Sequence, residues 1–197
     1  MLKLVIFDYY GVLVPAARNG EIFVKTFKHF GYDVKASDRV VGQRLIDQMN
    51  DVAQKYGATI DYNDFVKVFE GYKAEDSSIN AFNTDLIPLI KEISSKYKLV
   101  VLSKSPDDQI KAMLESQGIL ESFSKIIGLE EDRFFDEERK KHKLDLILHE
   151  FGIEGNETVL IDDSPDNLVD ANELGIHAIA YINVRNADRG FPEYCHK

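Results

Sequence analysis

Five short apolar runs occur along the chain, and none of them shows the alternation of polar and apolar residues that marks a half-exposed strand. Unbroken runs of Val, Ile and Leu are typical of strands that are covered on both faces. The pattern therefore predicts five buried strands, which are Leu2–Asp8, Leu99–Ser103, Lys125–Gly128, Thr158–Asp163 and His177–Ile182.

Apolar residues at helical spacing lie between these runs and predict helices there. One stripe precedes the second strand and comprises Leu86, Ile87, Leu89, Ile90 and Ile93. Another precedes the fourth strand and comprises Leu144, Ile147, Leu148 and Phe151. A cap at Thr84 or Asp85 would begin the first helix, and Gly152 would end the second. Strands that alternate with helices indicate an α/β fold, a doubly wound, parallel, five-stranded Rossmann-like sheet.

The segment from residue 15 to residue 81 breaks this alternation, because it contains helical patterns and no strand pattern. Three helices are predicted in it: Glu21–Phe30, Ser37–Tyr56 and Asp61–Tyr72. The segment is too long for an ordinary crossover. We expect an α/β core made of residues 1–14 and 82–197, with residues 15–81 inserted as an all-helical cap that lies above the strand ends.

Smaller features of these regions can also be interpreted. Five phenylalanines of the insertion have helical spacing and are expected to form the core of the cap: Phe23, Phe27, Phe30, Phe65 and Phe69. The polar tail from Asn186 to Lys197 is expected to be loosely ordered.

The net charge of −10 argues against a nucleic-acid partner or an anionic membrane surface. No stretch approaches the roughly 20 apolar residues that a membrane span needs. The chain has one cysteine, Cys195, which excludes an internal disulfide and fits a reducing compartment. We therefore expect a cytoplasmic location, while the oligomeric state is left open.

Polar residues follow three of the predicted strands directly, where ligands bind in parallel sheets. Asp8 follows the first strand, Ser103 the second, and the pair Asp162 and Asp163 the fourth. Each aspartate alone would more often be a turn residue or a helix cap. Three carboxylates in one small space are costly without a compensating cation, and Mg²⁺ prefers carboxylate oxygens and water. The sequence therefore predicts a magnesium site.

These segments resemble the motifs of the haloacid dehalogenase superfamily. The run that ends in Asp8, with Gly11 and Val12 after it, is similar to the first motif. Ser103 matches the second motif. The segment from Ile161 to Ile176 is similar to the acidic fourth motif and the helix after it, in the branch of small sugar-phosphate phosphatases and the phosphatase half of soluble epoxide hydrolase. The resemblance spans residues 5 to 182, and the helical insertion lies where the family places its first-position cap.

The resemblance implies a role for each of these residues. Asp8 would be a nucleophile that forms an aspartyl intermediate, which water then cleaves. The Mg²⁺ ligands would be Asp8, the backbone carbonyl of Tyr10 and Asp163, with support from Asp162. Ser103 would have a catalytic role by hydrogen-bonding the group that is transferred. Gly11, Ser103 and Lys104 would bind a small phosphorylated metabolite.

A lysine that neutralises the nucleophile is also implied by the resemblance. The family's Lys-Pro pair is absent, and the basic stretch from residue 139 to residue 143 offers several candidates. Counting back from Phe151 and Gly152 favours Lys140 as this catalytic lysine, with Lys141 second. Lys143 is a further candidate.

Tyr10 is the main departure from the family pattern, because the phosphatases carry an aspartate there that serves as general acid and base. Tyrosine, with an unperturbed pKa of about 10, is neutral at pH 7 and cannot serve as the carboxylic acid does. Tyr10 could donate a hydrogen bond to a leaving group, but it would be a poor base for hydrolysing the aspartyl intermediate. One hypothesis is a Mg²⁺-dependent phosphohydrolase that is weakened, or retuned to leaving groups needing little protonation. A second is a protein that binds phosphate and Mg²⁺ without turnover.

A third hypothesis is a metal-independent 2-haloacid dehalogenase, whose first motif has a tyrosine at the position of Tyr10. Arg39 also lies near the place of an essential arginine in those enzymes. However, they replace the acidic pair Asp162 and Asp163, and they have asparagine where this chain has Lys104. These two differences favour the phosphohydrolase.

Overall fold

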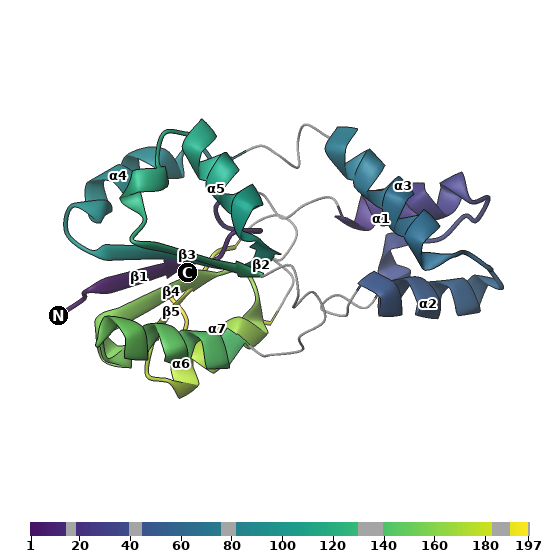
Figure 1. Cartoon of the computed structure of the whole chain (residues 1–197). Coiled ribbons are helices and arrows are strands. Elements are labelled where there is room, and N and C mark those ends of the chain that lie inside the picture. The colour runs from purple at the N-terminus through teal and green to yellow at the C-terminus, as the bar shows by residue number, and fades with distance from the viewer. Residues whose placement is uncertain (15–18, 40–44, 76–81, 130–139, 183–189, 197) are drawn as a thin grey trace. The chain divides into compact units, whose positions relative to one another are not determined.

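The chain was analysed as a computed structural model, which describes residues 1–14, 19–39, 45–75, 82–129, 140–182 and 190–196 (Figure 1). It divides into two compact units. Unit 1 comprises Met1–Pro15 and Phe82–Lys197, and unit 2 comprises Ala16–Ala81. A role for unit 2 as a cap over the strand ends stays a prediction.

Unit 1 is built on a parallel sheet of five strands in the order β3-β2-β1-β4-β5. The strands are β1 (Leu4–Phe7), β2 (Lys98–Pro106), β3 (Lys125–Leu129), β4 (Thr158–Asp162) and β5 (His177–Ala180). The central strand is β1, in which Leu4 pairs with Lys98 of β2 and with Thr158 of β4. The predicted α/β fold class is confirmed.

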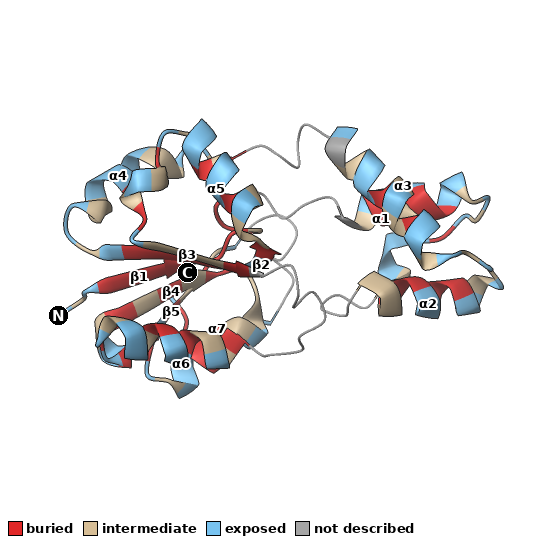
Figure 2. Cartoon of the chain, viewed as in Figure 1, coloured by how far each residue is buried: buried red, intermediate tan, exposed pale blue. Residues whose placement is uncertain are grey.

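Helices cover both faces of this sheet (Figure 1). The described helices of unit 1 are α4 (Leu86–Ser94), α5 (Asp107–Ser116), α6 (Lys140–Phe151) and α7 (Pro165–Glu173), with short 3₁₀ turns η2 (Leu120–Ser122) and η4 (Gly155–Glu157). Helices α4 and α5 lie on one face, and α6 and α7 lie on the other. All four residues of β1 are buried, as Figure 2 shows for the strand as a whole.

The two faces of β1 explain why its sequence is an unbroken apolar run. Leu4 and Ile6 pack into the core under α6 and α7, whereas Val5 and Phe7 pack into the core under α4 and α5. Successive side chains of a strand point to opposite faces, so a strand between two helical layers needs apolar residues at every position.

The described secondary structure of unit 2 consists of helices and a 3₁₀ turn: α1 (Asn19–His29), η1 (Ala36–Asp38), α2 (Leu45–Tyr56) and α3 (Tyr62–Glu75). Its core contains buried Phe23, Phe27, Phe65 and Phe69, with Phe30 packed against them. The interpretation of these phenylalanines as core is confirmed.

Two expectations about local structure are wrong. A helix does not begin at Ser37, because Ala36–Asp38 forms a 3₁₀ turn and Arg39 has an extended backbone; α2 begins at Leu45, after residues 40–44, which lie outside the described residues. The end of the tail is not loose, because Cys195 is buried and His196 pairs with Ile179 of β5. The predicted tail residues 186–189 and 197 lie outside the described residues.

Candidate active site

Three carboxylates of unit 1 lie together at the carboxyl end of the sheet. Asp8 follows β1, Asp162 ends β4, and Asp163 comes next. Asp8, Asp162 and Asp163 each offer a ligand oxygen, and these oxygens lie within 4.8 Å of one another. Since β1 and β4 are neighbours in register, the two strand ends bring side chains 154 positions apart in numbering into one cluster. A hard divalent cation suits such a group of oxygens.

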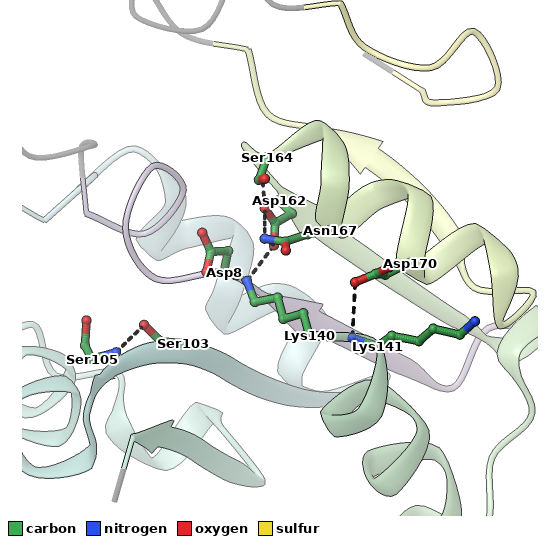
Figure 3. Close-up of polar contacts among 9 residues, drawn as sticks. All are labelled: Asp8, Ser103, Ser105, Lys140, Lys141, Asp162, Ser164, Asn167 and Asp170. Carbon is green, nitrogen blue, oxygen red and sulfur yellow. Dashed lines mark hydrogen bonds and ion pairs between the residues drawn. The ribbon is translucent and has the colours of Figure 1, made fainter. Parts of the chain in front are cut away.

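Lys140 enters this cluster from the first residue of α6 (Figure 3). Its Nζ lies 2.7 Å from Oδ1 of Asp8 and 2.6 Å from Oδ2 of Asp162. The lysine is buried, with 6% of its surface exposed. Its ammonium therefore joins the carboxylate groups at the ends of the two strands.

The neighbouring lysines point elsewhere. The Nζ of Lys141 contacts Glu173 of α7 at 2.6 Å, in an ion pair exposed to solvent. Figure 3 shows the Lys141 side chain directed away from the carboxylate cluster. Lys143 donates to the backbone carbonyl of Gly128. Of the three candidate lysines, the structure brings only Lys140 to the described site.

Asp162 is fully buried and already accepts four hydrogen bonds. Its Oδ1 accepts from the backbone N–H of Ser164 and from Nδ2 of Asn167, and its Oδ2 accepts from Lys140 and from the same Nδ2. A carboxylate has about four lone-pair sites, so these three donor groups, one of them shared between both oxygens, occupy most of the acceptor capacity of Asp162. Asp162 thus orients Lys140 and is poorly suited to bind a metal directly.

Charge in the cluster is unbalanced despite Lys140. Burial, followed by the neighbouring carboxylate of Asp162, raises the pKa of Asp8 to about 7, although Lys140 opposes the change. Burial lowers the pKa of Lys140, but Asp162 and Asp8 together raise it above its usual value, so the ammonium stays charged. Three carboxylates and one ammonium leave two formal negative charges.

Ser103 lies in β2, close to the strand's carboxyl end, and is buried. Its Oγ accepts a hydrogen bond of 3.0 Å from the backbone N–H of Ser105 (Figure 3). A serine oxygen that is already an acceptor can direct its own O–H hydrogen to another group. Lys104, between the two serines, is exposed.

Gly11 allows Asp163 to approach the backbone after β1. A Cβ at Gly11 would lie only 2.3 Å from Cγ of Asp163, and the glycine has a φ of +100°. Both the contact and the backbone conformation require glycine. Gly11 therefore shapes the cluster, instead of contributing a side chain to it.

A sequence profile described as Haloacid dehalogenase-like hydrolase matches residues 5–181, which is most of the chain. The chain belongs to this family. The match includes the segments that carry Asp8, Ser103, Lys140 and the pair of aspartates after β4. No curated protein matches the chain at a significant level.

Solved structures of family proteins share the fold. A haloacid dehalogenase-like family hydrolase from Streptococcus pneumoniae is 19% identical, with a TM-score of 0.65, and the match covers 91% of this chain and 84% of that one. A predicted phosphoglycolate phosphatase from Haemophilus somnus is 15% identical, with a TM-score of 0.70 and the same coverages. A conserved haloacid dehalogenase-like protein of unknown function from Agrobacterium tumefaciens is 18% identical, with a TM-score of 0.72, and covers 96% and 89%.

Within this family fold, Tyr10 replaces the expected second aspartate. Its hydroxyl accepts a hydrogen bond of 3.1 Å from Nε2 of Gln109, in the first turn of α5. Its ring meets the buried ring of Tyr9 edge-on. Tyr10 is therefore held on the β2 and α5 side of β1, whereas Lys140 approaches from the α6 side.

Arg39, the residue that favoured a dehalogenase, lies in unit 2. Its Nε donates to Gln48 at 2.6 Å, and its guanidinium lies over the ring of Phe23. These contacts hold Arg39 against the core of unit 2, and a catalytic role for it stays a prediction. Among the described residues, no helix is both long and apolar enough to cross a membrane.

Sequence reasoning missed Asn167, Ser105 and Gln109 as parts of the site. Asn167 lies five positions after Asp162, in the first turn of α7, so a polar residue near the start of that helix was a usable signal. Gln109 contacts a residue 99 positions away in the sequence, and nothing in the local sequence marks that contact.

Proposed function

We propose that the protein is a Mg²⁺-dependent phosphohydrolase that acts on a small phosphorylated metabolite through an aspartyl intermediate on Asp8. The observation that carries the proposal is the buried Asp8–Lys140–Asp162 arrangement with Asp163 beside it. A nucleophilic carboxylate, a fixed ammonium and a further carboxylate for metal binding are the groups that phosphoryl transfer to an aspartate needs.

The donor set fits Mg²⁺. Asp162 already accepts from Lys140, Ser164 and Asn167, so Asp8 and Asp163 are the carboxylates that would hold the ion. The backbone carbonyl of Tyr10 would join them. The two formal negative charges of the cluster match a divalent cation. When bound, Mg²⁺ would neutralise phosphoryl charge and lower the pKa of Asp8, which keeps the nucleophile ionised.

In the first step, a carboxylate oxygen of Asp8 attacks phosphorus while the bond from phosphorus to the leaving oxygen breaks. The leaving oxygen takes the electron pair of that bond. In the second step, water attacks the phosphorus of the aspartyl phosphate, and the bond from phosphorus to Asp8 breaks with its electron pair staying on the carboxylate. The released inorganic phosphate carries the oxygen and the protons of the water. Both steps concentrate negative charge on the phosphoryl oxygens, so catalysis depends on groups that stabilise this charge.

Lys140 and Ser103 would stabilise the phosphoryl group from opposite sides. The ammonium of Lys140 is anchored by Asp162, so it needs little reorganisation when charge develops. The O–H of Ser103 can donate to a phosphoryl oxygen because its oxygen is occupied by the N–H of Ser105. Lys104, exposed beside Ser103, is a candidate to attract the anionic substrate.

Tyr10 restricts which substrates would react well. A neutral phenol is a weaker acid than the missing aspartate, and a positioned acid or base is worth about 10² to 10⁴ in rate. The rate falls least, relative to an enzyme with the aspartate, for esters whose leaving group departs without a full proton transfer. We therefore propose aryl, enol or acyl phosphates as better substrates than alkyl phosphates.

The test is hydrolysis of para-nitrophenyl phosphate by the purified chain with Mg²⁺, with and without a chelator. We expect turnover that the chelator abolishes and that Asp8→Asn reduces by at least about 10³-fold. Asp145→Asn, on the exposed side of α6, is the matched control and should leave the rate unchanged.

Two other outcomes would replace this proposal. Chelator-insensitive chloride release from 2-chloropropionate would identify a dehalogenase. Inertness toward both substrates, together with Mg²⁺-dependent thermal stabilisation by inorganic phosphate, would identify a protein that binds phosphate without turnover.

A further inference from the structure

In the hydrogen bond between Gln109 and Tyr10, the glutamine is the donor and the tyrosine hydroxyl is the acceptor. Nε2 of the glutamine lies 3.1 Å from the phenolic oxygen and donates to it. A phenol carries one hydrogen and can both accept and donate. Because the oxygen accepts from Gln109, the hydrogen of Tyr10 is left to donate in another direction.

No second hydrogen bond of the Tyr10 side chain occurs in the part of the chain that the structure describes. The donor capacity of the phenol is therefore open to a ligand. Few residue types would produce this arrangement: a glutamate at position 109 would accept the hydrogen, and a leucine would leave the phenol unrestrained.

The backbone around Tyr10 is also fixed. The N–H of Gly11 donates to the carbonyl of Val14 at 2.7 Å, and the N–H of Val14 donates to the carbonyl of Tyr9 at 2.8 Å. The rings of Tyr9 and Tyr10 meet with their centroids 4.9 Å apart. Gln109 completes this restraint at the tip of the Tyr10 side chain.

Gln109 lies at the same edge of the sheet as the carboxylate cluster of Asp8, Asp162 and Asp163. It belongs to the first turn of α5, which begins directly after β2, and β2 carries Ser103. Since β2 pairs with β1, the strand that precedes Asp8, the Tyr10–Gln109 contact lies at the carboxyl end of β1 on the side of the strand that carries Ser103.

We propose that Gln109 is a positioning residue for Tyr10, which it orients so that the phenolic O–H donates to the leaving oxygen of the substrate. This inference rests on the proposed phosphohydrolase function and deepens it. As the phosphorus–oxygen bond breaks, the leaving oxygen gains the electron pair and the phenol stabilises it by a hydrogen bond. The proton stays on Tyr10 when the leaving group is a weaker base than phenolate, as in activated aryl and acyl phosphates.

The test compares Gln109→Glu with Gln109→Leu, each in the wild-type chain and in a Tyr10→Phe background. Substrates are phenyl phosphate, with a basic leaving group, and para-nitrophenyl phosphate, with a weakly basic one. Gln109→Glu keeps the size of the side chain and reverses the hydrogen bond. We expect kcat for phenyl phosphate to fall about tenfold in both variants, the value of one hydrogen bond, with KM little changed.

Leaving-group dependence separates this role from a structural one. The loss should be smaller for para-nitrophenyl phosphate, and in the Tyr10→Phe background either substitution at position 109 should have no further effect. Gln117→Glu and Gln117→Leu, just after α5, are matched controls and should not change kcat. Thermal unfolding of each variant should stay near that of the wild type.

Three results would overturn the inference. Equal losses for both substrates would indicate a general disturbance of the site. A loss with Gln109→Glu that persists in the Tyr10→Phe background would indicate simple charge repulsion. If the wild type is active and depends on Asp8, but the Gln109 variants have the same kinetics as the wild type, Gln109 has no positioning role and the proposed function stands. An inert wild type would overturn the proposed function together with this inference.

Discussion

No side chain fits between Gly11 and Asp163. A Cβ on the glycine would lie 2.3 Å from Cγ and 2.4 Å from Oδ2 of the aspartate. The carboxylate proposed as a Mg²⁺ ligand is therefore positioned by the absence of a side chain in the loop after β1.

Gly11→Ala should displace Asp163 and weaken Mg²⁺ binding by at least tenfold. The substitution also strains the backbone, whose φ of +100° favours glycine. Mg²⁺ titration followed by thermal unfolding measures the loss. Gly118→Ala is the control, because Gly118 also has a positive φ but has no atom within 4 Å of the added Cβ. Equal Mg²⁺ affinity in the two variants would contradict the role given to Gly11.

Lys140→Met should abolish most turnover and destabilise the chain by about 3 kcal/mol or more, because it leaves two buried carboxylates without their cation. Mg²⁺ should restore part of the lost stability. Lys141→Met is the matched control, with an expected change within about 0.5 kcal/mol, since its pair with Glu173 is exposed. Chemical denaturation and phosphatase rates check both, and similar losses in the two variants would refute the assignment.

Tyr10→Asp should raise phosphatase activity at least tenfold, most clearly on alkyl phosphates, because it restores a carboxylic acid for the leaving group and a base for water. Tyr10→Asn introduces a side chain of nearly the same size as aspartate but without a carboxylic acid, so it should not raise the activity. The measurement is kcat/KM for an alkyl phosphate. A rate in Tyr10→Asp that stays at or below that of the wild type would count against our interpretation of Tyr10.

Unit 2 should lose stability in acid through Asp38, which accepts hydrogen bonds from Lys55, Tyr56 and the backbone of Lys35. Chiefly the bond from Lys55 holds the pKa of Asp38 well below its usual value. A lowered folded pKa stabilises the native state above the unfolded pKa of about 3.9, and this contribution is lost as pH falls below that value.

Circular dichroism melts between pH 7 and pH 2 test this. Asp38→Asn should be less stable than the wild type at pH 7 and should show a weaker loss in acid. Asp51→Asn, on the exposed surface of α2, serves as control. Parallel acid profiles for the wild type and Asp38→Asn would show that Asp38 does not provide this stability.

The strands could be predicted because each sits between two helical layers and must be apolar at every position, as in β1. Their ends were less predictable. Strand β2 continues past Ser103 to Pro106, through an irregularity in its pairing with β3 that leaves no mark in the hydrophobic pattern. The helix expected from Ser37 does not form there, because Ala36–Asp38 is a 3₁₀ turn and Arg39 after it has an extended backbone.

The candidate site was predictable where topology determines it. Parallel strands deliver their last residues to one edge, so Asp8 and the Asp162–Asp163 pair could be expected to meet. Lys140 was favoured because the family resemblance implies a lysine before the fourth strand, and counting back from Phe151 and Gly152 ranked it ahead of Lys141. Side-chain partners such as Gln109 and Asn167 could not be assigned with the same rule, since their contacts depend on how α5 and α7 pack and on rotamers.

The position of unit 2 in the chain bears on how the protein folds. The chain leaves unit 1 soon after β1, and β2 is reached only after unit 2, although the two strands are neighbours at the centre of the sheet. The N–H of Asn83 donates to the carbonyl of Leu13 at 2.8 Å, so a backbone hydrogen bond joins the segments of unit 1 just before and just after unit 2. A helical unit that collapses on its own local contacts shortens the free chain that must be closed before the strands pair. The rate at which β1 joins β2 should therefore depend on how fast the helices of unit 2 fold.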